Sequence, residues 1–363
     1  MFAWFSRKGF GLGHGRRQRA FSLAGAVLLL AWPARAMEYS IEVLAALGGT
    51  YSRARAVNSD GQVVGEAYAS GVAYERGFCS YQGAAEELAT LGGVRSRAMA
   101  INEDGVIAGW AQDAAGKTRP VRWTESTPVP LPDSGLGGVA WGLNDAGDAV
   151  GQSTVMLGIY HAMLWTEGSS TAIDLGTLGG NYSVAYDINN LGQIVGSADD
   201  ADGDEWAVLW QGNEITQLDG LPGATWSTAR GINDLGQVIL WGDSAAGASR
   251  AALWDDGVVL DLGTLGGEDS WAYGLNNLGQ VVGWAELYEG NYHAFVYDGG
   301  DLVDLGTLGG MFSSAYGVND AGVIVGASTD TLGRWYAVQW TPVPLPGGVW
   351  LLLAGWILTP RRR

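Results

Sequence analysis

The residues of this 363-residue chain that could carry chemistry are few, and carboxylates are the most suggestive. Asp200, Asp202 and Asp204 alternate within the acidic stretch Asp199–Glu205, as the hard oxygen ligands of Ca²⁺ do in calcium-binding loops. The stretch lacks the glutamate that completes a typical calcium loop, and its glycine comes early. A weak calcium site and a solvated acidic turn therefore both stay open, and no other cofactor is suggested.

The other reactive side chains follow a repeat rather than converging on one site. His161 and His293 occupy the same position of two repeats, which predicts a structural role. Cys79 aligns with apolar residues of other repeats, which predicts a packed thiol rather than a nucleophile. The sequence contains no HExxH, GxSxG or phosphate-binding motif, so it assigns no catalytic residue and no metal beyond the possible Ca²⁺.

A repeat of about 43 residues must position these side chains. One pattern occurs seven times: an alanine, two residues, an apolar residue, an asparagine, two residues and a glycine. The asparagines follow one another at intervals of 42 to 45 residues. They are Asn58, Asn102, Asn144, Asn189, Asn233, Asn276 and Asn319. Such regular spacing indicates one supersecondary unit repeated along the chain.

Each repeat predicts four short strands. In the fourth repeat these are Ser183–Asn189, Gln193–Ala198 and Trp206–Trp210, and a strand such as Ser170–Leu175 leads into the repeat. Asparagine and glycine suit the tight turn between the first two strands, because glycine adopts a positive φ there. Short strands with glycine and aromatic signatures at this period are typical of propeller blades. We therefore predict an all-β fold, a seven-bladed β-propeller of four-stranded repeats over residues 37–341.

The two ends of the array predict how the ring closes. Tyr39–Leu44 precedes the first repeat, where a fourth strand would lie, and the seventh repeat stops after its third strand, Tyr336–Trp340. The N-terminal strand can therefore pair with the last blade. Such pairing removes exposed strand edges that would otherwise favour aggregation.

Residues 1–36 have the organisation of a secretory signal peptide. A basic stretch precedes the apolar run Ala20–Trp32, and the small residues Ala34 and Ala36 form the small-x-small site after which signal peptidase is expected to cleave. As a helix, the run would span roughly 20 Å, whereas a bilayer core needs about 30 Å. Cleavage is therefore the main interpretation, and an uncleaved anchor is the alternative.

Residues 342–363 form a second segment with a targeting pattern. Val343, Pro344, Leu345 and Pro346 precede the apolar stretch Gly347–Thr359, and three arginines follow. This order resembles the PEP-CTERM sorting signals of Gram-negative bacteria, in the variant that reads Val-Pro-Leu-Pro. The resemblance implies recognition by an exosortase, a membrane protease that removes the tail. A plain tail anchor is the alternative, because basic residues after an apolar segment also hold it in a membrane.

The repeats resemble the HAF-repeat family of extracellular bacterial proteins. His293-Ala294-Phe295 gives the motif literally, and the sequence DLGTLGG occurs at Asp174–Gly180, Asp261–Gly267 and Asp304–Gly310. The resemblance implies export and a repeat architecture but carries no established activity. Two repeats depart from the pattern, at Leu136–Gly138 and Leu221–Gly223, where we expect a different loop backbone.

The net charge of the chain restricts the classes of molecule that it can bind. Without the nine basic residues at the two ends, the body has 11 basic and 38 acidic residues, a net charge of −27. Such a body should repel nucleic acid, so we predict no nucleic-acid partner. A polysaccharide or protein ligand is possible, with the irregular tryptophans Trp226 and Trp284 as candidates for stacking on sugars. The variable loops between second and third strands should share one face with the DLGTLGG loops, and we expect any ligand face there.

Taken together, these features predict a non-catalytic exported protein of a Gram-negative bacterium. We expect it at the cell surface or in the exopolysaccharide matrix, at least transiently anchored by its C-terminus, as a binding or structural module. A hydrolase or lyase acting on polysaccharide is the alternative. Asp187 is the one candidate for that chemistry, since it replaces the small residue that other repeats carry two positions before the asparagine. The ligand and the oligomeric state stay open.

Overall fold

The computed structural model describes residues 38–343, which form strands and turns without a helix. Val343 is the last residue of the final strand. The cleavage residues Ala34 and Ala36 and the rest of the sorting motif, Pro344, Leu345 and Pro346, lie outside the described residues. No helix capable of crossing a bilayer occurs in the part of the chain that the structure describes.

Within residues 38–343, the first strand of each repeat is the innermost of its sheet, and the second follows it outward. The innermost strands are β2 (Gly48–Val57), β6 (Gly92–Ile101), β10 (Gly138–Leu143), β14 (Gly179–Ile188), β18 (Ser227–Ile232), β22 (Gly266–Leu275) and β26 (Gly309–Val318). The second strands are β3 (Val63–Ala69), β7 (Ile107–Asp113), β11 (Ala149–Met156), β15 (Ile194–Asp200), β19 (Val238–Asp243), β23 (Val281–Leu287) and β27 (Ile324–Asp330).

The third and fourth strands complete each sheet on its outer side. The third strands are β4 (Glu75–Tyr81), β8 (Thr118–Thr124), β12 (Ile159–Trp165), β16 (Glu205–Gln211), β20 (Ser249–Asp255), β24 (Tyr292–Tyr297) and β28 (Trp335–Val343). The outermost strands are β5 (Ala84–Glu87), β9 (Thr127–Pro130), β13 (Ile173–Asp174), β17 (Glu214–Gln217), β21 (Val258–Asp261), β25 (Leu302–Asp304) and, beside β28, β1 (Glu38–Val43). The expected strand Ser170–Leu175 is thus reduced to the two residues of β13.

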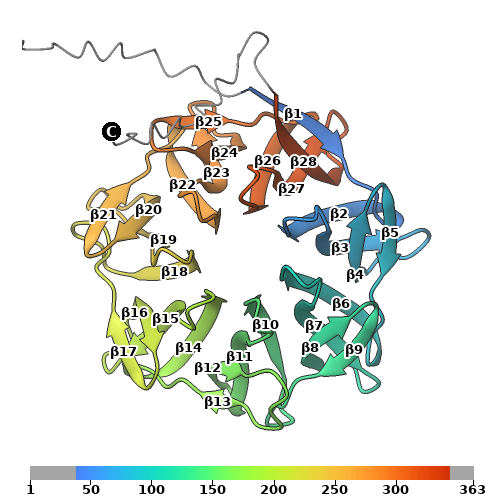
Figure 1. Cartoon of the computed structure of the whole chain (residues 1–363). Coiled ribbons are helices and arrows are strands. Elements are labelled where there is room, and N and C mark those ends of the chain that lie inside the picture. Colours follow the sequence, from blue (N-terminus) through green and yellow to red (C-terminus); the bar gives the residue numbers. More distant parts are fainter. Residues whose placement is uncertain (1–37, 344–363) are drawn as a thin grey trace, which may run out of the picture. The chain divides into compact units, whose positions relative to one another are not determined.

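The strands of residues 38–343 pair into five four-stranded sheets and one eight-stranded sheet. Within the larger sheet, β24 and β26 run parallel and meet only at Tyr292 and Phe312, whereas β1 and β28 pair antiparallel along six residues. Figure 1 shows the sheets arranged around a common centre, with the first strands facing it. This radial all-β arrangement confirms the predicted β-propeller.

The turn between the first two strands forms as the sequence predicts. In the fourth repeat, the amide of Gly192 donates to the carbonyl of Asn189 at 3.1 Å, and Gly192 has a φ of 75°. The expected deviation in repeats three and five is also present, because β10 and β18 have six residues where β14 has ten.

The hydrophobic core lies between neighbouring sheets. Each buried cluster of residues 38–343 combines side chains of two successive repeats, and one joins Ala54 and Phe78 of the first repeat to Val325 and Ala337 of the seventh. The alanines of the repeat motif are fully buried there, which explains why no larger residue occurs at their position. Trp340 is completely buried and donates to the carbonyl of Leu305 in the preceding repeat. The core therefore fixes the innermost strands in relation to one another.

Candidate binding channel

The innermost strands line a central channel with two connected cavities. One, of about 600 Å³, lies at the end of the channel where the repeat asparagines are. The other, of about 280 Å³, lies further along the same strands. The apolar residues that precede the asparagines line the first cavity, and five of them, Val57 and Leu143 included, line the second as well. The residues that line the channel therefore differ on the two sides of these apolar residues.

A ring of hydrogen bonds surrounds the first cavity. The side-chain nitrogen of each repeat asparagine donates to the backbone carbonyl of the next asparagine, as from Asn233 to Asn276 at 3.1 Å. Asn319 donates in the same way to Asn58 at 3.0 Å. The side-chain oxygen of Asn233 accepts from the amides of Leu235 and Gln237. Sequence reasoning predicted the contact within the turn but missed the bond to the next repeat, because spacing along the chain does not show which turns lie side by side.

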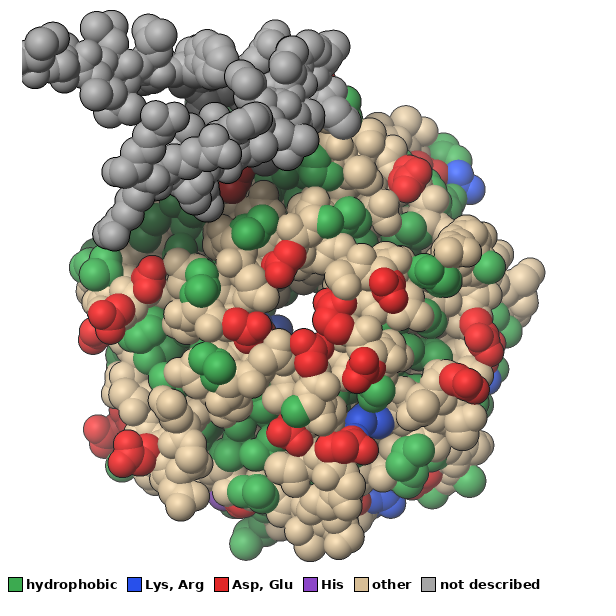
Figure 2. Space-filling view, in the orientation of Figure 1, with side chains coloured by type: hydrophobic (Ala, Val, Ile, Leu, Met, Phe, Trp, Pro, Cys, Tyr) green, Lys and Arg blue, Asp and Glu red, His purple; other side chains and the backbone are tan. Residues whose placement is uncertain are grey.

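The residues that follow the asparagines form the acidic mouth of the channel. They are Ser59, Glu103, Asp145, Asn190, Asp234, Asn277 and Asp320. Figure 2 shows acidic side chains around the central opening. Backbone amides and asparagine side chains engage these oxygens, as when the amide and Nδ2 of Asn190 donate to Asp234 at 2.8 and 3.1 Å. The mouth is thus strongly negative, and its carboxylates are held by the protein itself.

The second cavity is lined by a different set, which we call the arginine–aromatic belt. Its members lie three positions before the repeat asparagines: Arg55, Met99, Trp141, Tyr186, Arg230, Tyr273 and Tyr316. In all seven innermost strands the pairing register shifts at this residue, which marks a β-bulge. Bulges re-aim side chains and are frequent beside functional sites. Sequence reasoning missed the belt because these residue types differ between repeats and alternation alone does not reveal a bulge.

Arg55 is neutralised by a buried carboxylate. Its Nε and Nη2 donate to the two carboxylate oxygens of Glu66 at 2.9 and 2.7 Å, and the Glu66 side chain has no exposed surface. Burial alone would raise the pKa of Glu66, but the Arg55 guanidinium outweighs burial and lowers that pKa. Burial and the Glu66 charge together raise the pKa of Tyr51 to about 12. Arg55 and Glu66 therefore form an ion pair in which both charges are satisfied within the protein.

Arg230 lies at the same position of the fifth repeat but pairs with no carboxylate among the described residues. Its guanidinium carbon lies 3.6 Å from the centre of the Tyr186 ring and 4.2 Å from that of Trp241. Its Nε is buried without a hydrogen-bond partner. Burial lowers the pKa of Arg230, and the charge of Arg55 adds to this effect. The belt therefore holds a half-buried cation stacked on aromatic rings.

Aromatic side chains extend from the belt toward the far end of the channel. Trp241 and Trp271 have ring centres 4.4 Å apart, and Trp271 stacks on Trp284 at 5.8 Å with an interplanar angle of 12°. Tyr292 contacts Trp284 at 4.8 Å and Phe312 at 4.7 Å. We call these five residues the aromatic cluster. Trp284 was a candidate for sugar stacking from its sequence position, and the structure brings it into a continuous aromatic surface.

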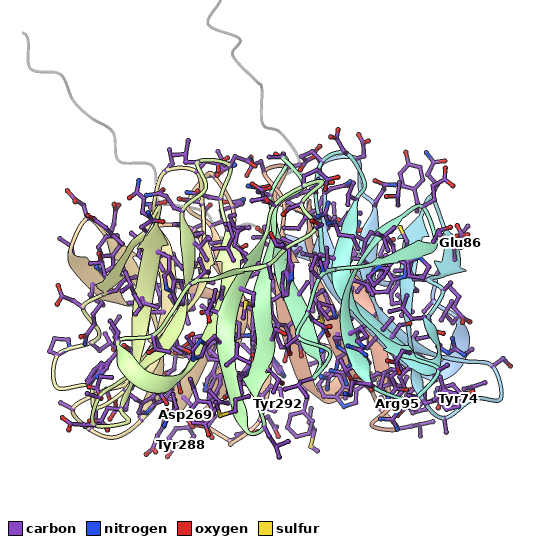
Figure 3. All side chains as sticks on the ribbon, turned by 90° about the horizontal axis from the view of Figure 1, so that it is seen from below. Tyr74, Glu86, Arg95, Asp269, Tyr288 and Tyr292 are labelled. Carbon is purple, nitrogen blue, oxygen red and sulfur yellow. The ribbon has the colours of Figure 1, made fainter. Side chains whose placement is uncertain are left out.

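The aromatic cluster reaches what we call the loop face, where the loops between second and third strands meet the DLGTLGG loops. Leu178 of one loop bridges to Asp200 of the other, and Leu308 bridges to Asp330 in the same way. Figure 3 places Arg95, Tyr288 and Tyr292 at this end of the molecule. The expected sharing of one face by the two kinds of loop is confirmed.

Asp187 lines the second cavity, but its carboxylate is tied to backbone. Its Oδ1 accepts from the amide of Ile188 at 2.9 Å, and its Oδ2 accepts from the amide of Ile232 in the next repeat at 3.0 Å. Burial raises the pKa of Asp187 to about 6, against the lowering effect of these two amides. No second carboxylate occurs among the described residues that line this cavity, whereas polysaccharide hydrolysis requires two.

The structure does not bring the three candidate calcium ligands together. Asp200 Oδ1 accepts from the amides of Asp202 and Asp204 at 2.9 and 3.1 Å, and its Oδ2 accepts from the Trp206 indole at 3.0 Å. Amide hydrogen bonds, led by that of Asp204, lower the pKa of Asp200. Among residues 38–343, no group of three or more His, Cys, Asp or Glu side chains is arranged to hold a metal. The geometry is that of a hairpin turn capped by its own aspartate.

The histidines and the cysteine have structural surroundings. His161 Nδ1 lies 2.8 Å from Asp174 Oδ2, and His293 Nδ1 lies 2.9 Å from Asp304 Oδ2. In both repeats the partner is the aspartate of the DLGTLGG sequence, so the histidine fastens the fourth strand to the third. Cys79 is half-buried beside a core cluster, and burial raises the pKa of its thiol, which disfavours the reactive thiolate.

No family model matches the chain, and no curated protein is significantly similar to it in sequence. Solved structures are similar in fold. A puromycin-hydrolysing peptidase from Mycobacterium tuberculosis superposes with a TM-score of 0.53 at 13% identity, over 83% of this chain and 55% of that chain. The β-propeller domain of the trilobed protease from Pyrococcus furiosus gives a TM-score of 0.51 at 10% identity, over 80% and 93% of the chains.

TolB from Acinetobacter baumannii gives a TM-score of 0.46 at 14% identity, over 66% of this chain and 63% of that chain. This chain therefore spans less than two thirds of the length of both the TolB chain and the peptidase chain. At such identities the likeness concerns the fold alone. Together with the radial arrangement of sheets, the match with the β-propeller domain of the trilobed protease shows that the fold is a β-propeller.

Proposed function

We propose that the protein is a non-catalytic, exported binding propeller that takes a polymer, most simply a polysaccharide, at its loop face. The observation that carries this proposal is the Arg230 guanidinium, which has no carboxylate partner among the described residues and lies on an aromatic surface that continues to the loop face. Ligand sites combine apolar and aromatic walls with a few polar groups that lack partners in the protein. The four carboxylates that line the acidic mouth in the described part of the chain are not free in this way, because each accepts a hydrogen bond from a neighbouring repeat.

The architectural part of the proposal is a ring of seven blades closed by the N-terminal strand. The ladder between β1 and β28 supports it, since Glu38 lies opposite Val343 and Val43 opposite Val338. The bond from Asn319 to Asn58 and the core cluster between the seventh and first repeats support it independently. On this proposal the eight-stranded sheet counts as two blades, joined only at Tyr292 and Phe312.

Removing Tyr39–Leu44 tests ring closure. We expect a markedly lower melting temperature and lower solubility, because the outer edge of β28 loses its partner and Tyr39 and Ile41 no longer cover the core beside Trp340. Unchanged melting and solubility would contradict closure by β1. A matched control is removal of an equal number of residues from the apolar tail, which lies outside the described residues.

We also propose that the two ends direct export, with signal peptidase cleaving after Ala36 and an exosortase recognising Val343–Pro346. The order of basic, apolar and small residues at each end supports this reading. The intact mass of protein recovered from cells tests both ends in one measurement. A mass that includes either segment would contradict cleavage at that end and favour an anchor.

Binding is tested on a glycan array with the protein as recovered from cells. We expect retention on a subset of acidic glycans, with competition by the free saccharide. Retention on no glycan would remove the binding proposal and favour a structural matrix component. The raised pKa of Asp187 favours a second candidate function, the cleavage of polysaccharide by a hydrolase or lyase mechanism. Turnover on a carbohydrate panel that is lost in Asp187→Ala would establish that candidate in place of the first.

A further inference from the structure

We infer that the belt is a recognition site for an acidic sugar residue, whose carboxylate or sulfate pairs with the Arg230 guanidinium while its ring packs on aromatic belt residues that line the cavity, such as Trp141 and Tyr273. This inference rests on the proposed binding function and specifies its ligand class. It is carried by the contrast between two arginines that line the same cavity.

The first step is the unmatched charge. A guanidinium withdrawn from water normally pairs with a carboxylate, because an isolated buried ion is strongly disfavoured. Arg55 has such a partner in Glu66, at 2.7 Å. Arg230 has no carboxylate partner within the described residues, and its Nε has no acceptor. A ligand carboxylate would supply the missing acceptor and could bind the planar guanidinium through two parallel hydrogen bonds.

The second step is the shape of the surroundings. The cavity beside Arg230 has a volume of about 280 Å³, near the lower limit for ligand sites, so it fits one sugar residue or a smaller anion. Tyr186 and Trp241 flank the guanidinium, and Trp141 and Tyr273 line the wall of the cavity itself. Flat aromatic rings beside a cation suit a ligand that has both an apolar ring face and an acidic group.

The third step is the distribution of charge along the channel. Five of the eleven basic residues of the body lie on the innermost strands before the asparagine ring: Arg53, Arg55, Arg95, Arg97 and Arg230. The opposite end carries the carboxylates of the acidic mouth, including Glu103 and Asp145. An anion approaching the mouth is repelled, whereas one approaching from the loop face meets arginines. Arg55 pairs with Glu66, Arg95 and Arg97 pair with Glu75, and Asp269 also lies at the loop face, so Arg53 and Arg230 are the arginines of this set without a carboxylate partner among the described residues.

The test measures the tryptophan fluorescence of the protein recovered from cells while sodium glucuronate is added. Methyl glucoside is the neutral probe of matched ring size, and inorganic sulfate is the free-anion probe. We expect glucuronate to bind at least tenfold more tightly than methyl glucoside, because a hydrogen bond to a charged group contributes that much to affinity. Arg230→Gln should weaken glucuronate binding at least tenfold and leave the weak binding of methyl glucoside unchanged.

Two variants control for charge and for folding. Arg334→Gln removes a positive charge from the exposed Asp330–Arg334 pair on the loop face and should leave glucuronate binding unchanged. Arg230→Lys keeps the charge but loses the planar fork, so we expect an affinity between those of wild type and Arg230→Gln. A glucuronate affinity that decreases from wild type to Arg230→Lys to Arg230→Gln would support the site, and the use of two variants at this position guards against poor folding of one of them.

Three outcomes would overturn the inference. They are equal binding of glucuronate and methyl glucoside, unchanged affinity in Arg230→Gln, and competition by inorganic sulfate as strong as that by glucuronate, which would assign the site to a free anion. Failure here is distinguishable from failure of the proposed function. If the array shows binding of neutral glycans alone, the proposed binding function stands and the acidic-sugar site is ruled out. If no glycan of the array binds but glucuronate binds at Arg230, the polymer-binding function is ruled out and the acidic-sugar site stands.

Discussion

The two ends of the channel are built from the same seven strands but satisfy their polar groups differently. At the acidic mouth, carboxylate and amide side chains bond to neighbouring repeats, as Asn190 does with Asp234. At the belt, Arg230 has aromatic neighbours and no carboxylate partner among the described residues. Buried polar groups are normally paired, so an unpaired one calls for a functional explanation. The comparison teaches that the polar groups of the mouth are satisfied by neighbouring repeats, whereas Arg230 of the belt is not paired with a carboxylate among the described residues.

The same contrast exists within the belt. Arg55 and Arg230 occupy equivalent bulge positions, but β3 supplies Glu66 opposite the first, and Trp241 of β19 lies beside the second. One residue on the second strand therefore decides whether an arginine is structural or available. Substitutions at the two positions should have opposite effects on the stability of the protein without ligand, and this is the most direct way to test the comparison.

We expect the largest effect from Arg55→Met. The substitution leaves the Glu66 carboxylate buried without a partner, which should lower the free energy of unfolding by about 3–5 kcal/mol at neutral pH. Arg230→Met removes an unpaired charge and should leave that free energy unchanged or raise it. Urea unfolding at pH 7 measures both. An equal loss of stability in the two variants would show that Arg230 has a structural partner after all.

The pH dependence of wild-type stability follows from the same pair. The folded-state pKa of Glu66 lies below its usual value, so the unfolded state binds more protons as the pH falls through the ordinary glutamate range. The stabilisation is complete above the unfolded pKa of about 4.5 and is lost as the pH falls through the folded pKa. Arg55→Met should lack this acid-dependent loss.

The second effect in size concerns the asparagine ring. Asn233 is buried, accepts two amide hydrogen bonds and donates to the Asn276 carbonyl and to the Gln237 side chain. Asn233→Ala leaves several buried groups unpaired and should lower the free energy of unfolding by about 2–4 kcal/mol. Urea unfolding with Leu235→Ala as control measures this, because Leu235 is an exposed residue of the same turn. A loss no larger than that of the control would mean that the ring contributes nothing to cohesion.

The sequence was sufficient for the fold class, since the asparagine and glycine positions set the period and the turns. It also anticipated a different loop backbone at Leu136–Gly138 and Leu221–Gly223, which precede the shortened strands β10 and β18. It was not sufficient for the belt. Which side chain enters the channel depends on a bulge at Tyr186 or Arg230, and a bulge shifts the alternation that sequence analysis relies on.

The candidate site shows the same limit. The alternating aspartates Asp200, Asp202 and Asp204 drew attention because their pattern is local, yet Asp200 is occupied by its own turn and by Trp206. Arg230 gave no signal, since a single arginine in a strand has no distinctive context. Its significance depends on which residues of other strands lie beside it, and only the pairing of distant segments reveals that a carboxylate is missing.

A smaller effect is expected at Asp187. Its folded-state pKa of about 6 exceeds the ordinary value of 3.8, so between these values the unfolded state binds fewer protons and stability falls as the pH rises. Because Asp187 is half-buried at the wall of the cavity, we expect a loss on the order of 1–2 kcal/mol across this window. Asp187→Ala, which matches Ala56 and Ala100 of other repeats, should remove this pH dependence. A profile unchanged by the substitution would assign the titration to another group.

The smallest effect should come from the acidic mouth itself. Asp234→Asn keeps a side-chain oxygen that can accept from the Asn190 amide, and asparagine already occupies this position at Asn190 and Asn277. We therefore expect the free energy of unfolding to change by no more than about 0.5 kcal/mol, as for most surface substitutions. Glucuronate binding at high salt should also be unchanged, since salt screens the charge that remains at the mouth. If Asp234→Asn instead destabilised the protein as much as Asn233→Ala, charge rather than hydrogen bonding would hold this end of the channel together. The mouth would then resemble the belt in depending on electrostatic partners, and the distinction between a self-sufficient end and an available end would fail.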